Sequence, residues 1–154
     1  MNFSQHIAKH LRDVYFGGNW TSVNLKNTLD GMDWQLALKK VGEGNNIATI
    51  VYHMTYYVRE VSKVLEGGAL EAKDKFSFEH PPIQSQADWE NMLATIWGEA
   101  ESFASLIEAM PDEKLLQDFS DPKYGTYYRN LQGIIEHLHY HLGQVVILKK
   151  MLQT

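Results

Sequence analysis

The chain has 154 residues, of which 44% are hydrophobic and 21% are charged, with a formal net charge of −5 and no cysteine. This length predicts one globular domain, residues 1–154, whose core is large enough to fold without disulfides. The lack of cysteine excludes disulfides and thiolate metal ligands, and the negative charge argues against nonspecific binding to nucleic acid.

The first part of the chain is predicted to hold two long helices and a short one. Apolar residues at helical spacing predict a helix over 3–16, which Gly17 ends because glycine accepts the left-handed conformation of a helix C-terminus. A short amphipathic helix is expected over 21–29. The second long helix is predicted to start at Asn45 or Asn46, since asparagine is a good N-cap.

The rest of the chain is predicted to hold two more long helices. The second long helix ends at the glycine pair 67–68, and the third is capped by Ser85 or Asp88 and ends at Pro111. The fourth is predicted over 126–152. No segment shows convincing strand alternation, so the pattern predicts an all-α helical bundle.

Two links between the predicted helices are unusually long, at 67–87 and 111–125. Links of this length without secondary structure are uncommon in compact domains and are often functional. They could cross over the bundle instead of turning tightly, so the helices need not follow a simple up-down-up-down order.

The most informative segment is 134–144, in the fourth predicted helix. His137 and His141 are four residues apart, so on a helix they lie one turn apart and about 40° from each other around the axis. Two such imidazoles can hold one divalent cation, with each nitrogen about 2.0–2.1 Å from the metal. His139 points elsewhere, because residues two apart do not share a helix face. Gln144 could orient a ligand histidine, but we expect it to pack, since it lies one turn beyond His141.

A third candidate ligand, His53, lies at the edge of the apolar stripe in the second long helix. Bundles build metal sites from side chains on facing helices, so His53, His137 and His141 could hold one cation with an open position, as in catalytic zinc sites. The alternatives are roles for these histidines that involve no metal. The pair in the fourth helix could be solvated or hydrogen-bonded in the core, and His53 could be a hydrogen-bonded core residue.

The remaining histidines and motifs add little to this pattern. The other histidines, which we expect to be structural or to face solvent, are His6, His10 and His80. Tyr56 and Tyr57 follow His53 by three and four residues, so one of them is expected to border a metal pocket. The sequence has no His-Glu-x-x-His zinc-protease motif, no glycine-rich phosphate loop and no Gly-x-Ser-x-Gly nucleophile elbow.

The sequence predicts a cytoplasmic protein that does not enter a membrane. No apolar run approaches the roughly 18 residues that a membrane span needs. The first six residues do not join a basic stretch to an apolar one, so we expect no signal peptide. The lack of disulfides is also typical of the cytoplasm.

The order of the histidines is similar to that of a known family. A histidine in the second long helix, followed in the fourth by His-Leu-His-Tyr-His-Leu-Gly-Gln at 137–144, resembles the DinB/YfiT-like superfamily of metal-dependent proteins. The resemblance covers nearly the whole chain, including Trp20 after the first helix and the long links. Relatives often carry a further histidine and an arginine near the second ligand, where this chain has Tyr140 and Leu142.

The resemblance implies a four-helix bundle with up-down-down-up topology, long crossover connections and a metal site made by His53, His137 and His141. It implies zinc or nickel as the metal, a small-molecule substrate, a low-molecular-weight thiol as cosubstrate, and a homodimer. The expected function is that of a metal-dependent enzyme, either a thiol-dependent S-transferase or a hydrolase. In both, the metal would act as a Lewis acid and lower the pKa of a bound thiol or water.

Two other classes of function remain open from the residues alone. The cation could be structural or sensory, or the chain could be a metal-free bundle that acts through protein contacts. An accessible pocket at the rings favours an enzyme, whereas a closing fourth ligand such as a carboxylate favours a structural metal. Rings paired to backbone carbonyls favour a metal-free bundle.

Overall fold

The computed structural model describes all residues from 1 to 154, and it is helical without any strand. Its six α-helices, four of them long, are α1 Phe3–Phe16, α2 Leu25–Leu29, α3 Trp34–Leu38, α4 Ile47–Leu65, α5 Gln86–Glu108 and α6 Tyr127–Leu152. Three short 3₁₀ helices lie in the links: η1 Asp74–Phe78, η2 Asp112–Leu116 and η3 Pro122–Tyr124. The all-α prediction is confirmed.

The long helices begin at polar residues whose side chains cap them. Asn46, Ser85 and Thr126 each accept a hydrogen bond from the backbone N–H three residues later, which pairs one of the otherwise free N–H groups of the first turn. Asn2 does the same for α1. The four long helices therefore begin within three residues of where the sequence predicts them.

The short elements differ from the prediction. The helix expected over 21–29 begins only at Leu25, because Asn19 holds the preceding residues in a loop: its side chain accepts from the N–H of Thr21 and donates to the carbonyl of Val23. The five-residue helix α3, capped by Asp33, was not predicted at all. Five residues are too few to show a 3.6-residue period.

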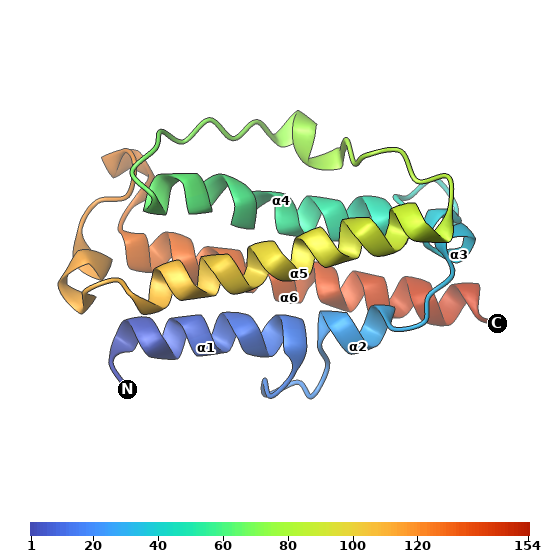
Figure 1. Cartoon of the computed structure of the whole chain (residues 1–154), viewed down its shortest axis with the longest axis horizontal. Helices are drawn as coiled ribbons and strands as arrows, with labels where there is room; N and C mark the ends of the chain where they lie inside the picture. Colours follow the sequence, from blue (N-terminus) through green and yellow to red (C-terminus); the bar gives the residue numbers. More distant parts are fainter.

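The four long helices lie side by side along the long axis of the molecule (Figure 1). Helix α4 packs against α5 and α6, and α1 packs against the same two helices from the other side. The largest fully buried side chains of the core include Met54, Trp89, Phe103, Leu131 and Leu138. After α4 the chain runs back along the length of that helix, through η1, before α5 begins (Figure 1).

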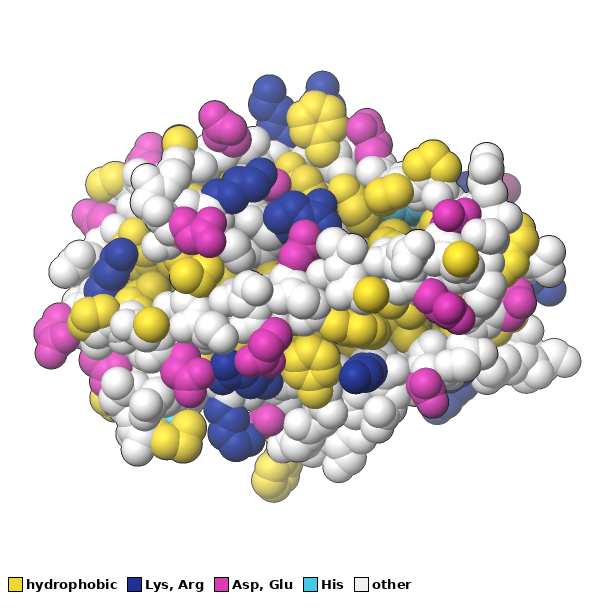
Figure 2. Space-filling view, in the orientation of Figure 1, with side chains coloured by type: hydrophobic (Ala, Val, Ile, Leu, Met, Phe, Trp, Pro, Cys, Tyr) yellow, Lys and Arg dark blue, Asp and Glu magenta, His cyan; other side chains and the backbone are white.

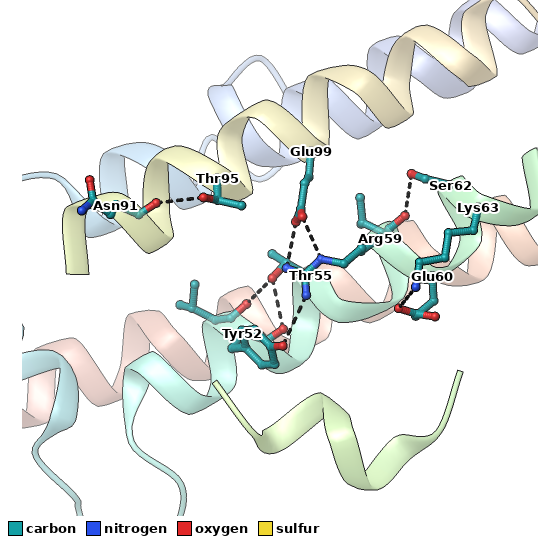
Figure 3. A network of polar contacts seen from close by, with 11 residues as sticks. Tyr52, Thr55, Arg59, Glu60, Ser62, Lys63, Asn91, Thr95 and Glu99 are labelled. Atoms are coloured by element: carbon teal, nitrogen blue, oxygen red, sulfur yellow. Dashed lines mark hydrogen bonds and ion pairs between the residues drawn. The ribbon is translucent and has the colours of Figure 1, made fainter. Parts of the chain in front are cut away.

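A bidentate ion pair joins α4 to α5. Arg59 Nε and Nη2 donate to the two carboxylate oxygens of Glu99 at 2.7 and 3.0 Å, and Arg59 Nη1 donates to the hydroxyl of Tyr52 at 3.3 Å. Figure 3 shows Glu99 reaching from α5 to Arg59. The hydrogen bond that Arg59 donates to Glu99 is the main reason that the pKa of Arg59 is raised. The pair therefore adds two charge-assisted hydrogen bonds to the apolar packing of α5 on α4.

Replacing Glu99 with glutamine should lower the free energy of unfolding by about 1–2 kcal/mol, because one half of a two-pronged, partly shielded pair is lost. Urea unfolding measures the change. Glu101→Gln is the matched control, since Glu101 bonds Arg12 at a more exposed position and should cost less than about 0.5 kcal/mol. Equal losses in the two variants would contradict the assigned role of Glu99.

The surface carries charges of both signs, interspersed over the face that Figure 2 shows, and histidine is visible there only in small areas. No helix is both long enough and apolar enough to cross a membrane.

Candidate metal centre

Three histidine rings converge between α4 and α6. The Nε2 atom of His137 lies 3.2 Å from Nε2 of His53 and 3.0 Å from Nε2 of His141. The three ring nitrogens that could act as ligands all lie within 4.8 Å of one another. The structure thus brings together the three residues that the sequence singled out.

The positions of the rings follow from how the two helices pack. Leu138 and Leu142 point into the core of the bundle and are almost fully buried. Each lies one residue after a ring of the pair, so His137 and His141 stand at the flank of the core, on the side where α6 meets α4. His53, which is 7% exposed, faces them from α4.

A serine in the α4–α5 link fixes the proton on His53. The hydroxyl of Ser77 donates its only proton to the backbone carbonyl of Asp74 at 2.6 Å, so it can only accept from Nδ1 of His53, which lies 2.7 Å away. His53 therefore carries its hydrogen on Nδ1 and leaves the lone pair of Nε2 free. That lone pair faces the other two rings.

Gln144 fixes His141 in the same way. The Nδ1 of His141 lies 2.7 Å from Oε1 of Gln144, and a carbonyl oxygen only accepts, so this nitrogen also carries the hydrogen. The expectation that Gln144 merely packs is wrong. Three residues further along a helix is close enough for its flexible side chain to reach back to the ring.

His137 lies at the centre of the cluster and stays uncharged. Its pKa is lowered to about 4, first by burial and then by the charges that His141 and His53 could carry. Burial also lowers the pKa of His53. The Nδ1 of His137 is buried and has no hydrogen-bond partner. At neutral pH His53 and His137 are therefore neutral imidazoles, the form that binds metals.

The donor set fits a divalent cation. Three nitrogens at about 2.0–2.1 Å from a tetrahedral metal lie about 3.3–3.4 Å apart, close to the distances observed here. Without a cation, the free lone pairs of His53 and His141 both point at Nε2 of His137, which can donate at most one hydrogen to one of them. A cation could accept a lone pair from Nε2 of each of the three rings. The group could therefore hold a metal ion, and no carboxylate belongs to it.

Aromatic side chains surround the rings. Phe78, at the end of η1, stacks on His53 with ring centroids 4.2 Å apart and planes 11° apart. Tyr57 meets His137 edge-on at 5.4 Å, which confirms that a tyrosine of α4 borders the site. Its hydroxyl donates to a carboxylate oxygen of Asp74 at 2.5 Å. Burial and this contact raise the pKa of Tyr57, so the hydroxyl stays protonated.

The other histidines lie outside the cluster. His139 is next to His10 of α1, with ring centroids 5.7 Å apart, as expected for a residue on a different face from the ligand pair. His80 approaches the carbonyl of Pro81, and His6 is exposed.

The free energy of unfolding of the metal-free protein should fall as the pH drops from about 6.5 toward about 4. In this window the unfolded chain, with ordinary histidine pKa values, binds more protons than the folded chain, whose His137 titrates only near 4. Urea unfolding in the presence of a chelator, at pH about 7 and about 5, measures the slope. The slope should flatten in His137→Gln and persist in His6→Gln, and an unchanged slope in His137→Gln would contradict the assignment.

Comparisons of the chain with protein-family models, with curated proteins and with solved structures found no match.

Proposed function

We propose that the protein is a metal-dependent enzyme in which His53, His137 and His141 hold a divalent cation, zinc or nickel. The observation that carries the proposal is the convergence of three Nε2 atoms, two of them left with free lone pairs by the hydrogen bonds on the opposite side of their rings. Hydrogen-bonded partners of this kind are typical of ligand histidines, whose orientation and tautomer they fix.

We further propose membership of the DinB/YfiT-like superfamily and its up-down-down-up four-helix bundle. Support comes from the order of the ligands, one on α4 and two on α6, and from the link that follows α4 back along its length (Figure 1). A link of that course allows two consecutive helices to run in the same direction. The cytoplasmic location and the homodimer stay predictions.

The chemistry proposed is attack on a small molecule by a thiol or by water. A bound cation supplies Lewis acidity, which lowers the pKa of a ligand thiol or water. The chain supplies three neutral ligands and no carboxylate, so the charge of the cation is not offset by its ligands. Two cavities reach the rings, one of about 400 Å³ at His137 and one of about 420 Å³ at His53 and His141.

Because the rings are accessible from these cavities, a catalytic metal site is better supported than a closed structural one. This access also supports a thiol cosubstrate with a separate electrophile, the S-transferase reaction, since the rings can be approached from two cavities. In the hydrolase alternative, one cavity would hold the substrate and the other would hold water.

The test is elemental analysis of protein purified without an affinity tag, followed by thiol-conjugation and hydrolysis assays on the metal-loaded and the chelated forms. We expect one metal per chain and turnover only in the loaded form. Metal binding without turnover of either kind would favour a metal-binding module without catalysis. No binding at low micromolar zinc would overturn the proposal and favour a bundle that acts through protein contacts.

A further inference from the structure

The cavity at His137 is also lined by an arginine. Arg129 lies two turns before His137 on α6, and its side chain lies over Gly133 between them. A methyl group on Gly133 would lie 3.1 Å from Nη1 of Arg129, so the guanidinium lies against the helix where Gly133 has no side chain. Arg129 and His137 therefore border the same cavity.

The rest of the cavity wall is largely apolar. Arg129 is the only charged residue that lines the cavity, because the ring of His137 is neutral. The aliphatic residues of the wall, which could contact a short hydrocarbon chain, are Val61, Leu70, Ala72 and Ile134. A divalent cation on the three histidines would give this cavity a second positive group beside the guanidinium, in a chain of net charge −5.

The ion pair that Arg129 makes with Glu136 is weak enough for a ligand to replace it. Its partner Glu136 does not line the cavity, the contact is long at 3.4 Å, and the two side chains are 66% and 69% exposed. Exposed pairs of this kind contribute little free energy. A ligand carboxylate in the cavity could therefore take the place of Glu136 at the guanidinium, with two parallel hydrogen bonds.

We propose that this cavity binds a thiol that carries a carboxylate at the end of a short apolar chain, with the sulfur toward the histidine cluster and the carboxylate on Arg129. The inference rests on the proposed function, because it needs the cation. Gly133 and His137 are four residues apart, about 6 Å along the helix axis, so a short chain is long enough to reach from one to the other.

The test uses cobalt-loaded protein, in which binding of a thiolate to the metal produces a sulfur-to-cobalt charge-transfer absorption. Titration with mercaptobutyrate and with mercaptobutanol compares two thiols that differ only at the far end. The wild type should bind the carboxylate about tenfold more tightly, the discrimination expected of a partly exposed charge-assisted contact. Arg129→Gln should reduce this ratio to about one and leave the affinity for mercaptobutanol unchanged.

Two further variants sharpen the result. Glu136→Gln removes the competing carboxylate and should raise the ratio. Lys150→Gln is the control for Arg129→Gln, because it removes one positive charge from an exposed part of α6, and it should leave the ratio unchanged. A wild-type ratio of about one, or a ratio that survives Arg129→Gln, would overturn this inference while the proposed function stands. A protein that binds no cobalt would overturn both.

Discussion

Alanine in place of His137 is expected to lower the affinity for zinc by at least about 100-fold. Structural zinc sites contribute about 10–16 kcal/mol through four ligands, so each ligand accounts for about 2.5–4 kcal/mol, which corresponds to about 10²–10³ in affinity. His137 is also the ring whose Nε2 approaches both others. Competition against a chromophoric chelator measures the loss. His53→Ala and His141→Ala should behave in the same way.

The matched control is His139→Ala. This residue lies on the same helix between the two ligands but on another face, next to His10. Its removal should leave zinc affinity within about threefold of the wild type, because it touches none of the three rings' ligand atoms. If His137→Ala and His139→Ala lose affinity equally, or if a variant lacking all three rings still carries one metal per chain, the assigned site is wrong.

Alanine in place of Ser77 should lower zinc affinity about 10- to 100-fold, although Ser77 would not touch the metal. Its hydroxyl is the acceptor that holds the hydrogen of His53 on Nδ1, and loss of such a partner typically has an effect of this size. Nitrogen NMR of the metal-free protein should show that His53 no longer favours a single tautomer.

Ser4→Ala is the control for Ser77→Ala. Both serines are fully buried, but the hydroxyl of Ser4 has no hydrogen-bond partner and lies in α1. Its loss should change neither zinc affinity nor the tautomer of His53. If Ser77→Ala lowers the free energy of unfolding but leaves zinc affinity at the wild-type value, Ser77 only supports the fold and does not position the ligand.

The long helices and the ligand rings could be predicted from local patterns. Capping residues such as Asn46 and Thr126 mark helix starts in the sequence itself, and the interval between His137 and His141 places both rings on one flank of any helix. His53 was found because it stands at the edge of an apolar stripe, where a helix meets its neighbour. Each of these signals is carried by residues close together in the chain.

The surroundings of the rings could not be predicted in this way. Ser77 and Phe78 lie in a link without periodicity, and they reach His53 only because that link folds back over α4. Arg129 was not singled out from the sequence, since nothing local shows that its side chain lies over Gly133. Tertiary packing decides these contacts, and a single sequence has no signal for it.

His53 and His137 are 84 positions apart in the chain, and they belong to helices that are joined only through α5 and two long links. A cation held by both would be a reversible cross-link between α4 and α6. At a free metal concentration 100 times the dissociation constant, such a cross-link raises the free energy of unfolding by about 2.7 kcal/mol. The melting temperature would then report how much metal the protein carries.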